Sequence, residues 1–258
     1  MPLGTELTYS DQLSFVERLY IKIFGVPVNG LRIRARRVLP LITEQYKNIL
    51  DAGCGPGIFT FEIAKRLPES TVTGADIEKT LLDRNTKIAR KAELDNCQFK
   101  YLDLAGMDNE DRFDLILSVD NLEHIEDDAN VLRRFYQSLT MDGELIVHVP
   151  GYERRWYFFG WAVNFHVKGH CRPGYTLEQL QEKVHNSGFK IREIYYTYGW
   201  LETITNNISY WITRAEMENK MLYALVFPLL NFFSYFGRNS RPEKGAGVLA
   251  IAYKSEQT

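Results

Sequence analysis

The sequence predicts an α/β fold in which a doubly wound, mostly parallel sheet carries helices on both faces. Three observations predict it. From residue 48 onward, apolar or β-branched runs alternate with helical stretches of roughly 10–15 residues, the pattern of successive strand–helix–strand units. One of these runs ends in a glycine-rich turn that opens a helix. The 258 residues are 45% apolar and 25% charged, a globular composition that provides a sizeable core.

The first 47 residues predict a helical cap. Apolar residues recur on one face of Ser10–Phe24, and Ser10 is expected to cap this helix. Gly25 follows as a helix breaker, and Leu31–Leu41 predicts a second helix. Four arginines lie between residues 32 and 37, so this helix carries either an anion site or a solvated basic face.

Residues 48–150 predict the core of the sheet. The strand candidates are short apolar or β-branched runs: Asn48–Asp51, Thr71–Ala75, Cys97–Leu102, Phe113–Val119 and Glu144–Val149. Hydrophobic periodicity predicts the intervening helices: Ile58–Leu67, Lys79–Ala92 and Ala129–Leu139. Pro68 ends the first of these helices, and Pro150 ends the last strand.

Residues after 150 complete the sheet and add two segments that do not fit it. A helix and two strands bring the predicted strands to seven: Leu177–Asn186 with Thr176 as its cap, then Lys190–Tyr196 and Val248–Tyr253. The segments Trp156–His166 and Lys220–Gly237 are aromatic-rich and nearly uncharged. Regions 151–170 and 204–245 are therefore expected to be helical and aromatic additions that face the substrate or a membrane, within a single domain, 1–258.

The glycine-rich turn, Asn48–Gly57, is the strongest motif. Glycine permits positive φ and close approach of the backbone to a ligand. Asp76 ends the next strand, where a carboxylate can accept hydrogen bonds from ribose hydroxyls. The spacing G-x-G-x-G differs from the dinucleotide pattern, and Asp51 at the turn's entrance disfavours pyrophosphate. A cationic ligand suits this carboxylate, and S-adenosylmethionine carries both a sulfonium and an ammonium group.

Four segments together resemble the class I S-adenosylmethionine-dependent methyltransferases, in the small-molecule (methyltransferase type 11) group that includes the UbiG- and UbiE-like quinone enzymes. They are ILDAGCGPG at 49–57, VTGADIE at 72–78, FKYLDLAGM at 99–107 and FDLILSVDNLEHIED at 113–127. The resemblance covers roughly residues 30–200. It implies a Rossmann-like fold, S-adenosylmethionine as cofactor and S-adenosylhomocysteine as product, with 48–150 as the cofactor-binding core.

The resemblance also assigns cofactor-binding residues. The glycine turn wraps the amino-acid end and ribose, Asp76 holds both ribose hydroxyls, and Asp103 bonds the adenine amino group. Arg32, with Arg36 as the alternative, is expected to hold the cofactor carboxylate, since arginine binds carboxylates bidentately. The full set is Arg32, Asp51, Gly53, Cys54, Gly55, Gly57, Asp76, Ile77, Asp103, Leu104 and Val119.

Histidines supply the candidate catalytic base, because a proton must leave the acceptor and histidine titrates near neutrality. His124 follows the fourth strand, at the cleft edge of a parallel sheet, and is expected either to act as base or to order its loop. His170 is the second candidate, whereas His148 lies within a strand and is expected in the core. Asp120, Glu123 and His124 resemble a divalent-metal site of UbiG-like enzymes, with a helix cap and surface charges as the alternative.

The two aromatic segments are the clue to the methyl acceptor. Apolar stretches with basic flanks line lipophilic pockets or lie at membrane interfaces, although buried helices that cover a sheet look the same. We expect a small hydrophobic acceptor: a lipid, a quinol or an aromatic metabolite. The alternatives are a polar small-molecule acceptor and a non-catalytic or regulatory cofactor-binding protein. The net charge of −2 and the sequence VDNL at 119–122 disfavour a nucleic-acid substrate.

Composition also bears on the cellular setting. Three cysteines at wide spacing indicate neither a disulfide framework nor a zinc site, which fits a reducing compartment. The first residues lack the basic start and apolar core of a signal peptide. We expect a cytoplasmic monomer or homodimer, either free or bound peripherally at the inner face of the membrane.

Overall fold

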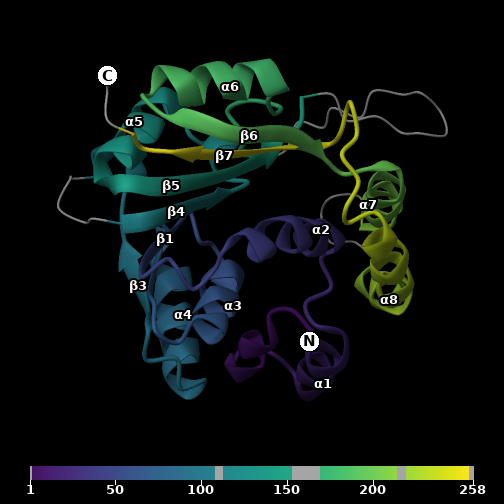
Figure 1. Ribbon diagram of the computed structural model, residues 1–258. Helices are drawn as coiled ribbons and strands as arrows, with labels where there is room; N and C mark the ends of the chain where they lie inside the picture. Colours follow the sequence, from purple (N-terminus) through teal and green to yellow (C-terminus); the bar gives the residue numbers. More distant parts are fainter. Residues whose placement is uncertain (1, 108–112, 153–168, 214–218, 256–258) are drawn as a thin grey trace.

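The computed structural model describes residues 2–107, 113–152, 169–213 and 219–255, and these form one α/β sheet with its helices (Figure 1). The strands are β1 (Asn48–Ala52), β2 (Thr71–Asp76), β3 (Cys97–Tyr101), β4 (Phe113–Val119), β5 (Leu139–Pro150), β6 (Lys190–Thr197) and β7 (Gly247–Tyr253). Their order is β3-β2-β1-β4-β5-β7-β6. The first five pair in parallel, and β7 runs antiparallel to both β5 and β6. The predicted mostly parallel, seven-stranded sheet is confirmed.

Helices cover both faces of this sheet. Figure 1 shows α5 (Asp128–Ser138) and α6 (Leu177–Asn186) on one face, and α3 (Ile58–Arg66) and α4 (Lys79–Lys91) on the other. Side chains of one strand alternate between the two cores, as the two-residue period of a strand requires. Ile116 of β4 packs with α5 and α6, whereas its neighbours Leu115 and Leu117 pack with α3. A strand buried on both faces explains the uninterrupted apolar runs in the sequence.

Some predicted boundaries are wrong. Helix α1 (Phe15–Phe24) begins after Ser14 rather than Ser10, because Ser14 and Glu17 cap each other's backbone N–H groups reciprocally. Helix α2 is Asn29–Val38 and ends in a short 3-10 turn. Strand β5 begins at Leu139, which the sequence assigned to the preceding helix, since Leu139 pairs with Phe113 of β4.

The predicted addition at 204–245 contains most of a helical pair. Helix α7 (Trp200–Thr213) and helix α8 (Lys220–Phe236) share a small apolar core, to which Ile212, Tyr223 and Phe227 contribute. The sequence did not predict α7, whose apolar residues alternate with threonine and asparagine. Among the described residues, no helix is long and apolar enough to cross a membrane. The predicted segment Trp156–His166 lies outside the described residues.

A buried ion pair fastens α7 to α2. The Glu202 side chain of α7 is fully buried and accepts hydrogen bonds from the Arg37 guanidinium and from the Gly199 N–H. Arg37 also donates to the carbonyl oxygens of Gly237 and Ser240, at 2.9 and 2.6 Å. The buried charges of Arg37 and Glu202 therefore compensate each other. Removal of one of them would leave the other buried without a counter-charge.

We predict that Glu202→Gln lowers the free energy of unfolding by roughly 3 kcal/mol, because it leaves the Arg37 charge buried without its carboxylate. Urea denaturation measures this change. Glu193→Gln is the matched control: its partner Arg241 and the glutamate itself are largely exposed, so a change below about 1 kcal/mol is expected. Equal effects of the two substitutions would contradict this assignment.

Candidate cofactor and active site

The turn after β1 has the conformation that its glycines permit. Gly53, Gly55 and Gly57 all have positive φ, at 76°, 47° and 78°. The N–H groups of Gly53 and Cys54 both donate to the Ala75 carbonyl of β2, at 2.8 and 2.9 Å. A Cβ atom at Gly53 would lie 2.3 Å from Asn121, whereas one at Gly55 would meet no atom within 4 Å. The turn is therefore fixed at its base and open beside Gly55.

Asp51, at the end of β1, is a buried carboxylate beside this turn. Asp51 is only 3% exposed, and its Oδ2 accepts a hydrogen bond of 2.6 Å from the Thr60 hydroxyl of α3. Burial raises the pKa of Asp51 to about 6, the Thr60 hydrogen bond opposes the rise, and the nearby Asp76 charge adds to it. A cationic ligand would stabilise the ionised carboxylate.

The ends of β2 and β3 bring the predicted ribose and adenine residues to one edge of the sheet. Asp76 accepts a 2.8 Å hydrogen bond from the Gly55 N–H, which couples it to the glycine turn. Ile77 follows and is largely exposed. Asp103 caps the short 3-10 turn Leu104–Gly106 by accepting from the Ala105 N–H at 3.0 Å, and Leu104 is buried.

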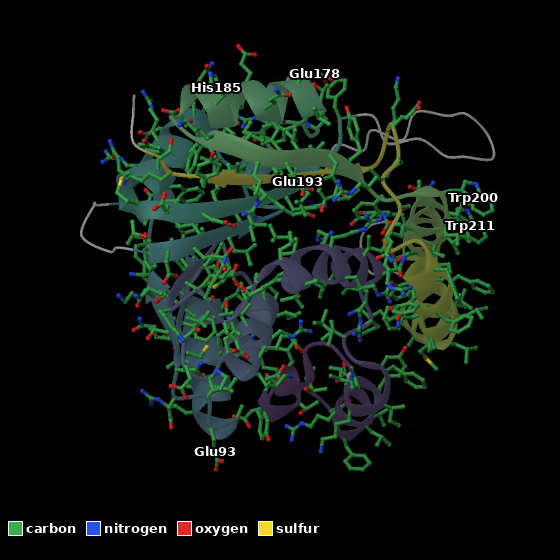
Figure 2. All side chains as sticks on the ribbon, in the orientation of Figure 1. Glu93, Glu178, His185, Glu193, Trp200 and Trp211 are labelled. Carbon is green, nitrogen blue, oxygen red and sulfur yellow. The ribbon has the colours of Figure 1, made fainter. Side chains whose placement is uncertain are left out.

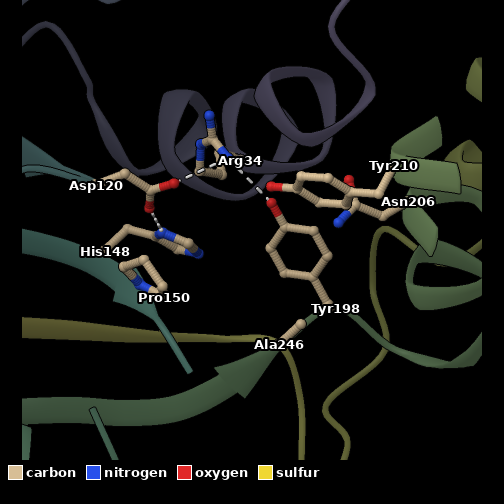
Figure 3. Close-up of a pocket in the computed structure, with 8 residues that line it drawn as sticks. All are labelled: Arg34, Asp120, His148, Pro150, Tyr198, Asn206, Tyr210 and Ala246. Carbon is tan, nitrogen blue, oxygen red and sulfur yellow. Dashed lines mark hydrogen bonds and ion pairs between the residues drawn. The ribbon is translucent and has the colours of Figure 1, made fainter. Parts of the chain in front are cut away.

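A polar network lies at the ends of β4 and β5 (Figure 3). Asn121, which follows β4, lies against Gly53 of the turn. Asp120 follows Val119, the last residue of β4, and has a positive φ of 49°. Its carboxylate pairs with His148 Nδ1 of β5 at 2.7 Å and with Arg34 of α2 at 2.9 Å. His148 is 1% exposed, so its predicted place in the core is confirmed. The polar role of His148 could not be predicted from the sequence, because its partners come from other elements.

Arg34 continues this network toward α7. Its Nη1 donates to the Tyr198 hydroxyl at 3.2 Å, and these side chains, with Asn206 and Tyr210, line a cavity of about 30 Å³. Burial is the strongest single influence on the pKa of Arg34 and lowers it, but Asp120, Tyr198 and Tyr210 together outweigh burial and raise the pKa above its ordinary value. The guanidinium is therefore held permanently charged beside the strand ends.

The structure places Arg34, not the predicted Arg32 or Arg36, at this edge of the sheet. Residues two apart on a helix point to nearly opposite sides, since each residue turns by about 100°. Arg32 donates to the Phe24 carbonyl, and Arg36 donates to Ser234 of α8 at 2.8 Å. The sequence shows the cluster of arginines but not which face of α2 meets the strands.

The two histidines predicted as catalytic lie together. The rings of His124 and His170 are 4.5 Å apart between centroids, in an edge-to-face arrangement. Glu123, His124 and His170 each offer a ligand atom within 4.8 Å of the others, which is a candidate metal-binding group among the described residues. Asp120, predicted to belong to that group, does not join it, because its two oxygens pair with His148 and Arg34. His170 takes its place.

The pKa of Asp51 predicts a pH dependence of stability. The unfolded value is about 3.9, so the folded chain holds more protons between about pH 4 and pH 6, and stability falls as pH rises through that window. Asp51→Asn removes this contribution. We expect the variant to gain up to about 3 kcal/mol over the wild type between pH 4 and pH 7 in urea titrations without ligand. Parallel pH profiles for the two proteins would contradict the assignment.

Comparisons with known proteins identify the family of this chain. A family model described as a methyltransferase domain matches residues 43–216, more than half of the chain. The trans-aconitate 2-methyltransferase of Deinococcus radiodurans is 33% identical over 117 residues, which cover 45% of this chain and 43% of that protein. The ubiquinone biosynthesis O-methyltransferase of Coxiella burnetii is 29% identical over 114 residues, covering 44% and 47%. The chain thus matches less than half the length of these relatives.

A solved structure supports the fold over nearly the whole chain. The phosphoethanolamine N-methyltransferase 2 of Haemonchus contortus, in complex with S-adenosyl-L-methionine, aligns with a TM-score of 0.61 at 19% identity. The alignment covers 96% of this chain and 60% of that one. With the glycine turn, the strand order and the family match together, the chain belongs to the class I S-adenosylmethionine-dependent methyltransferases.

Proposed function

We propose that this protein transfers the methyl group of S-adenosylmethionine to a small lipophilic acceptor at a membrane surface. The observation that carries the choice of acceptor is an apolar surface on α1, α7 and α8. It comprises Phe15, Val16, Leu19 and Ile23 of α1, Trp211 of α7, and Met221, Leu222, Leu225, Leu229, Phe232 and Phe236 of α8, all largely exposed. Figure 2 shows Trp211 pointing away from the molecule.

Helices α1 and α8, which carry most of this apolar surface, lie against each other. The Tyr20 hydroxyl of α1 donates to the Ala224 carbonyl of α8 at 2.7 Å, and Tyr20 packs into the core of the α7–α8 pair. Met221 is 90% exposed and Phe15 80% exposed, which is costly for side chains of this size in water. Contiguous exposed apolar patches mark protein or membrane interaction sites. Lys22 of α1 and Lys220 of α8 add positive charge to two of these helices, which suits an anionic bilayer.

The residues around the glycine turn would hold the cofactor. Asp76 would accept hydrogen bonds from the ribose hydroxyls, while Ile77 and Leu104 would flank the adenine and Asp103 would bond its amino group. Asp51 and the turn itself, with Gly53, Cys54, Gly55 and Gly57, would surround the cationic end. Val119 would contact the methionine part. Arg34 replaces Arg32 as the arginine proposed to meet the carboxylate.

The chain's contribution to the reaction would be alignment and removal of water. The cofactor supplies an activated methyl group on a sulfonium, which the acceptor displaces in line. Donor and acceptor then need only be held within reach of each other. His124 or His170 would take the acceptor's proton, since both rings lie at the carboxyl ends of the strands. A divalent ion held by Glu123, His124 and His170 would instead lower the pKa of a bound acceptor hydroxyl.

We predict that Asp76→Ala weakens binding of S-adenosylhomocysteine by about 1–3 kcal/mol, since it removes the carboxylate proposed to hold the ribose. Isothermal titration calorimetry measures the affinity. Asp83→Ala, an exposed position on α4, is the control and should bind as the wild type does. Because Asp76 also accepts from the Gly55 N–H, melting temperatures of the two variants should be compared. Unchanged affinity in Asp76→Ala would refute the placement.

The proposed acceptor class is tested with a labelled methyl donor. Phenol, catechol and amine acceptors are offered with and without a ten-carbon alkyl chain, in the presence of mixed phosphatidylcholine and phosphatidylglycerol vesicles. We expect kcat/KM to rise at least about tenfold with the alkyl chain, as apolar burial contributes about 0.8 kcal/mol per CH₂.

His124→Asn should lower kcat by about 10²–10⁴ if this ring is the base.

The outcome separates the alternatives. Turnover of the unsubstituted acceptors alone would favour a polar substrate and contradict the lipophilic proposal. Cofactor binding with no turnover of any acceptor would favour a non-catalytic protein. Loss of activity with EDTA and its return with Mg²⁺ would assign the Glu123, His124 and His170 group to a metal rather than to proton transfer.

A further inference from the structure

The face of α2 opposite Arg34 lines a second pocket, of about 400 Å³. Four arginines from three parts of the chain meet there: Arg32 and Arg36 of α2, Arg66 at the end of α3, and Arg238 just after α8. No acidic side chain is among the described residues that line it. The chain as a whole carries a net charge of −2, so this local concentration of positive charge stands out. Four like charges repel each other, and each guanidinium must therefore be held in place by its contacts.

Most contacts of these arginines are to neutral groups. Arg36 donates to the Ser234 hydroxyl and to the Asn231 carbonyl, at 2.8 and 3.1 Å. Arg238 lies over the Tyr235 ring, 3.9 Å from its centroid. Arg66 approaches a carboxylate, Oε2 of Glu62, at 3.7 Å, but that glutamate also pairs with Lys65 at 3.2 Å. The contacts orient the guanidinium groups without neutralising the cluster.

Arg32 is the deepest of the four. It is 7% exposed, donates to the Phe24 carbonyl, and its Nε has no hydrogen-bond partner among the described residues. Burial and then the charge of Arg36 lower the pKa of Arg32 to about 10. Burial also lowers the pKa of Arg36; the charges of Glu202 and Tyr235 oppose this, and Arg238 adds to it, so that the pKa stays below its ordinary value. A buried donor without a partner, among mutually repelling cations, is stabilised by a bound anion.

An apolar groove adjoins the arginine pocket. Phe24 of α1 and Phe227, Pro228 and Phe232 of α8 line a space of about 300 Å³ that shares Arg36, Asn231 and Tyr235 with the pocket. Phe232 also belongs to the exposed apolar surface. The two spaces are therefore adjacent and share one wall, with arginines lining one space and apolar side chains lining the other.

We propose that this pair of spaces binds an anionic amphiphile, with its phosphate in the arginine pocket and its apolar chain in the groove. Arginine matches phosphate because its planar donors bind two oxygens at once. The site lies on the other face of α2 from the Arg34–Asp120 pair, so it is separate from the methyl-transfer site. It does not depend on the proposed reaction, and it would fix the protein on a lipid surface or report the presence of such a lipid.

Calorimetry with soluble short-chain lipids tests this proposal on the full-length protein. We expect dihexanoyl phosphatidate to bind at least tenfold more tightly than both inorganic phosphate and dihexanoyl phosphatidylcholine. Arg36→Gln should weaken phosphatidate binding at least tenfold. Arg66→Gln should weaken it several-fold, and because the Arg66 side chain is half exposed, this change preserves the fold. Arg133→Gln, an exposed position on α5, is the matched control with no expected change.

The relative affinities show whether the ligand is an amphiphile and whether the arginines recognise it. Equal affinity for phosphate and phosphatidate would reduce the site to a simple anion pocket and overturn the amphiphile. Equal affinity for phosphatidylcholine and phosphatidate, or full affinity in both arginine variants, would remove the arginines from recognition. S-adenosylhomocysteine affinity and melting temperature are measured on the same variants. Unchanged values there, with lost phosphatidate binding, show a separate site rather than a misfolded protein.

Discussion

Both proposed sites depend on the ion pairs that the Asp120 carboxylate makes. Asp120 follows β4 in a left-handed conformation and pairs with His148 of β5 and Arg34 of α2. This triad holds α2 across the carboxyl ends of the parallel strands, where the glycine turn opens. Because α2 is fixed in rotation there, Arg32 and Arg36 must face the opposite way, toward α8. One ion pair thus places one arginine at the cofactor edge and gathers the others in the second pocket.

Much of the fold could be predicted from the sequence, because its signals are local. Buried parallel strands appear as uninterrupted apolar runs, and the glycine turn needs residues that accept positive φ. The errors have two causes: an overlooked local motif and buried positions that are polar. Ser14 rather than Ser10 caps α1 because Glu17 reciprocates, a Ser-x-x-Glu pattern that lies in the sequence itself. Helix α7 went unpredicted because its buried positions include Glu202 and threonines that bond within the fold, so burial there does not follow hydrophobicity.

The candidate site contains residues that a sequence motif identifies and residues that only the folded structure brings together. Asp76 and the glycines belong to one short stretch of the chain and could be found by motif, whereas ranking Arg34 above Arg32 requires the rotation of α2. Likewise, His170 joins Glu123 and His124 from a segment almost fifty residues away, while Asp120 is taken by partners on other elements. Elements outside the core, α1, α7 and α8, carry the exposed apolar residues and hence the evidence on the acceptor.

A crystal structure of the protein with S-adenosylhomocysteine would test the central claim most directly. The claim is that Asp120 positions α2 so that Arg34 completes a cofactor site on the glycine turn. The predicted result places the ribose hydroxyls on Asp76, the adenine between Ile77 and Leu104, and the carboxylate on the Arg34 side of α2. A carboxylate bound by Arg32 or Arg36, or a ligand away from the Gly53–Gly57 turn, would contradict it.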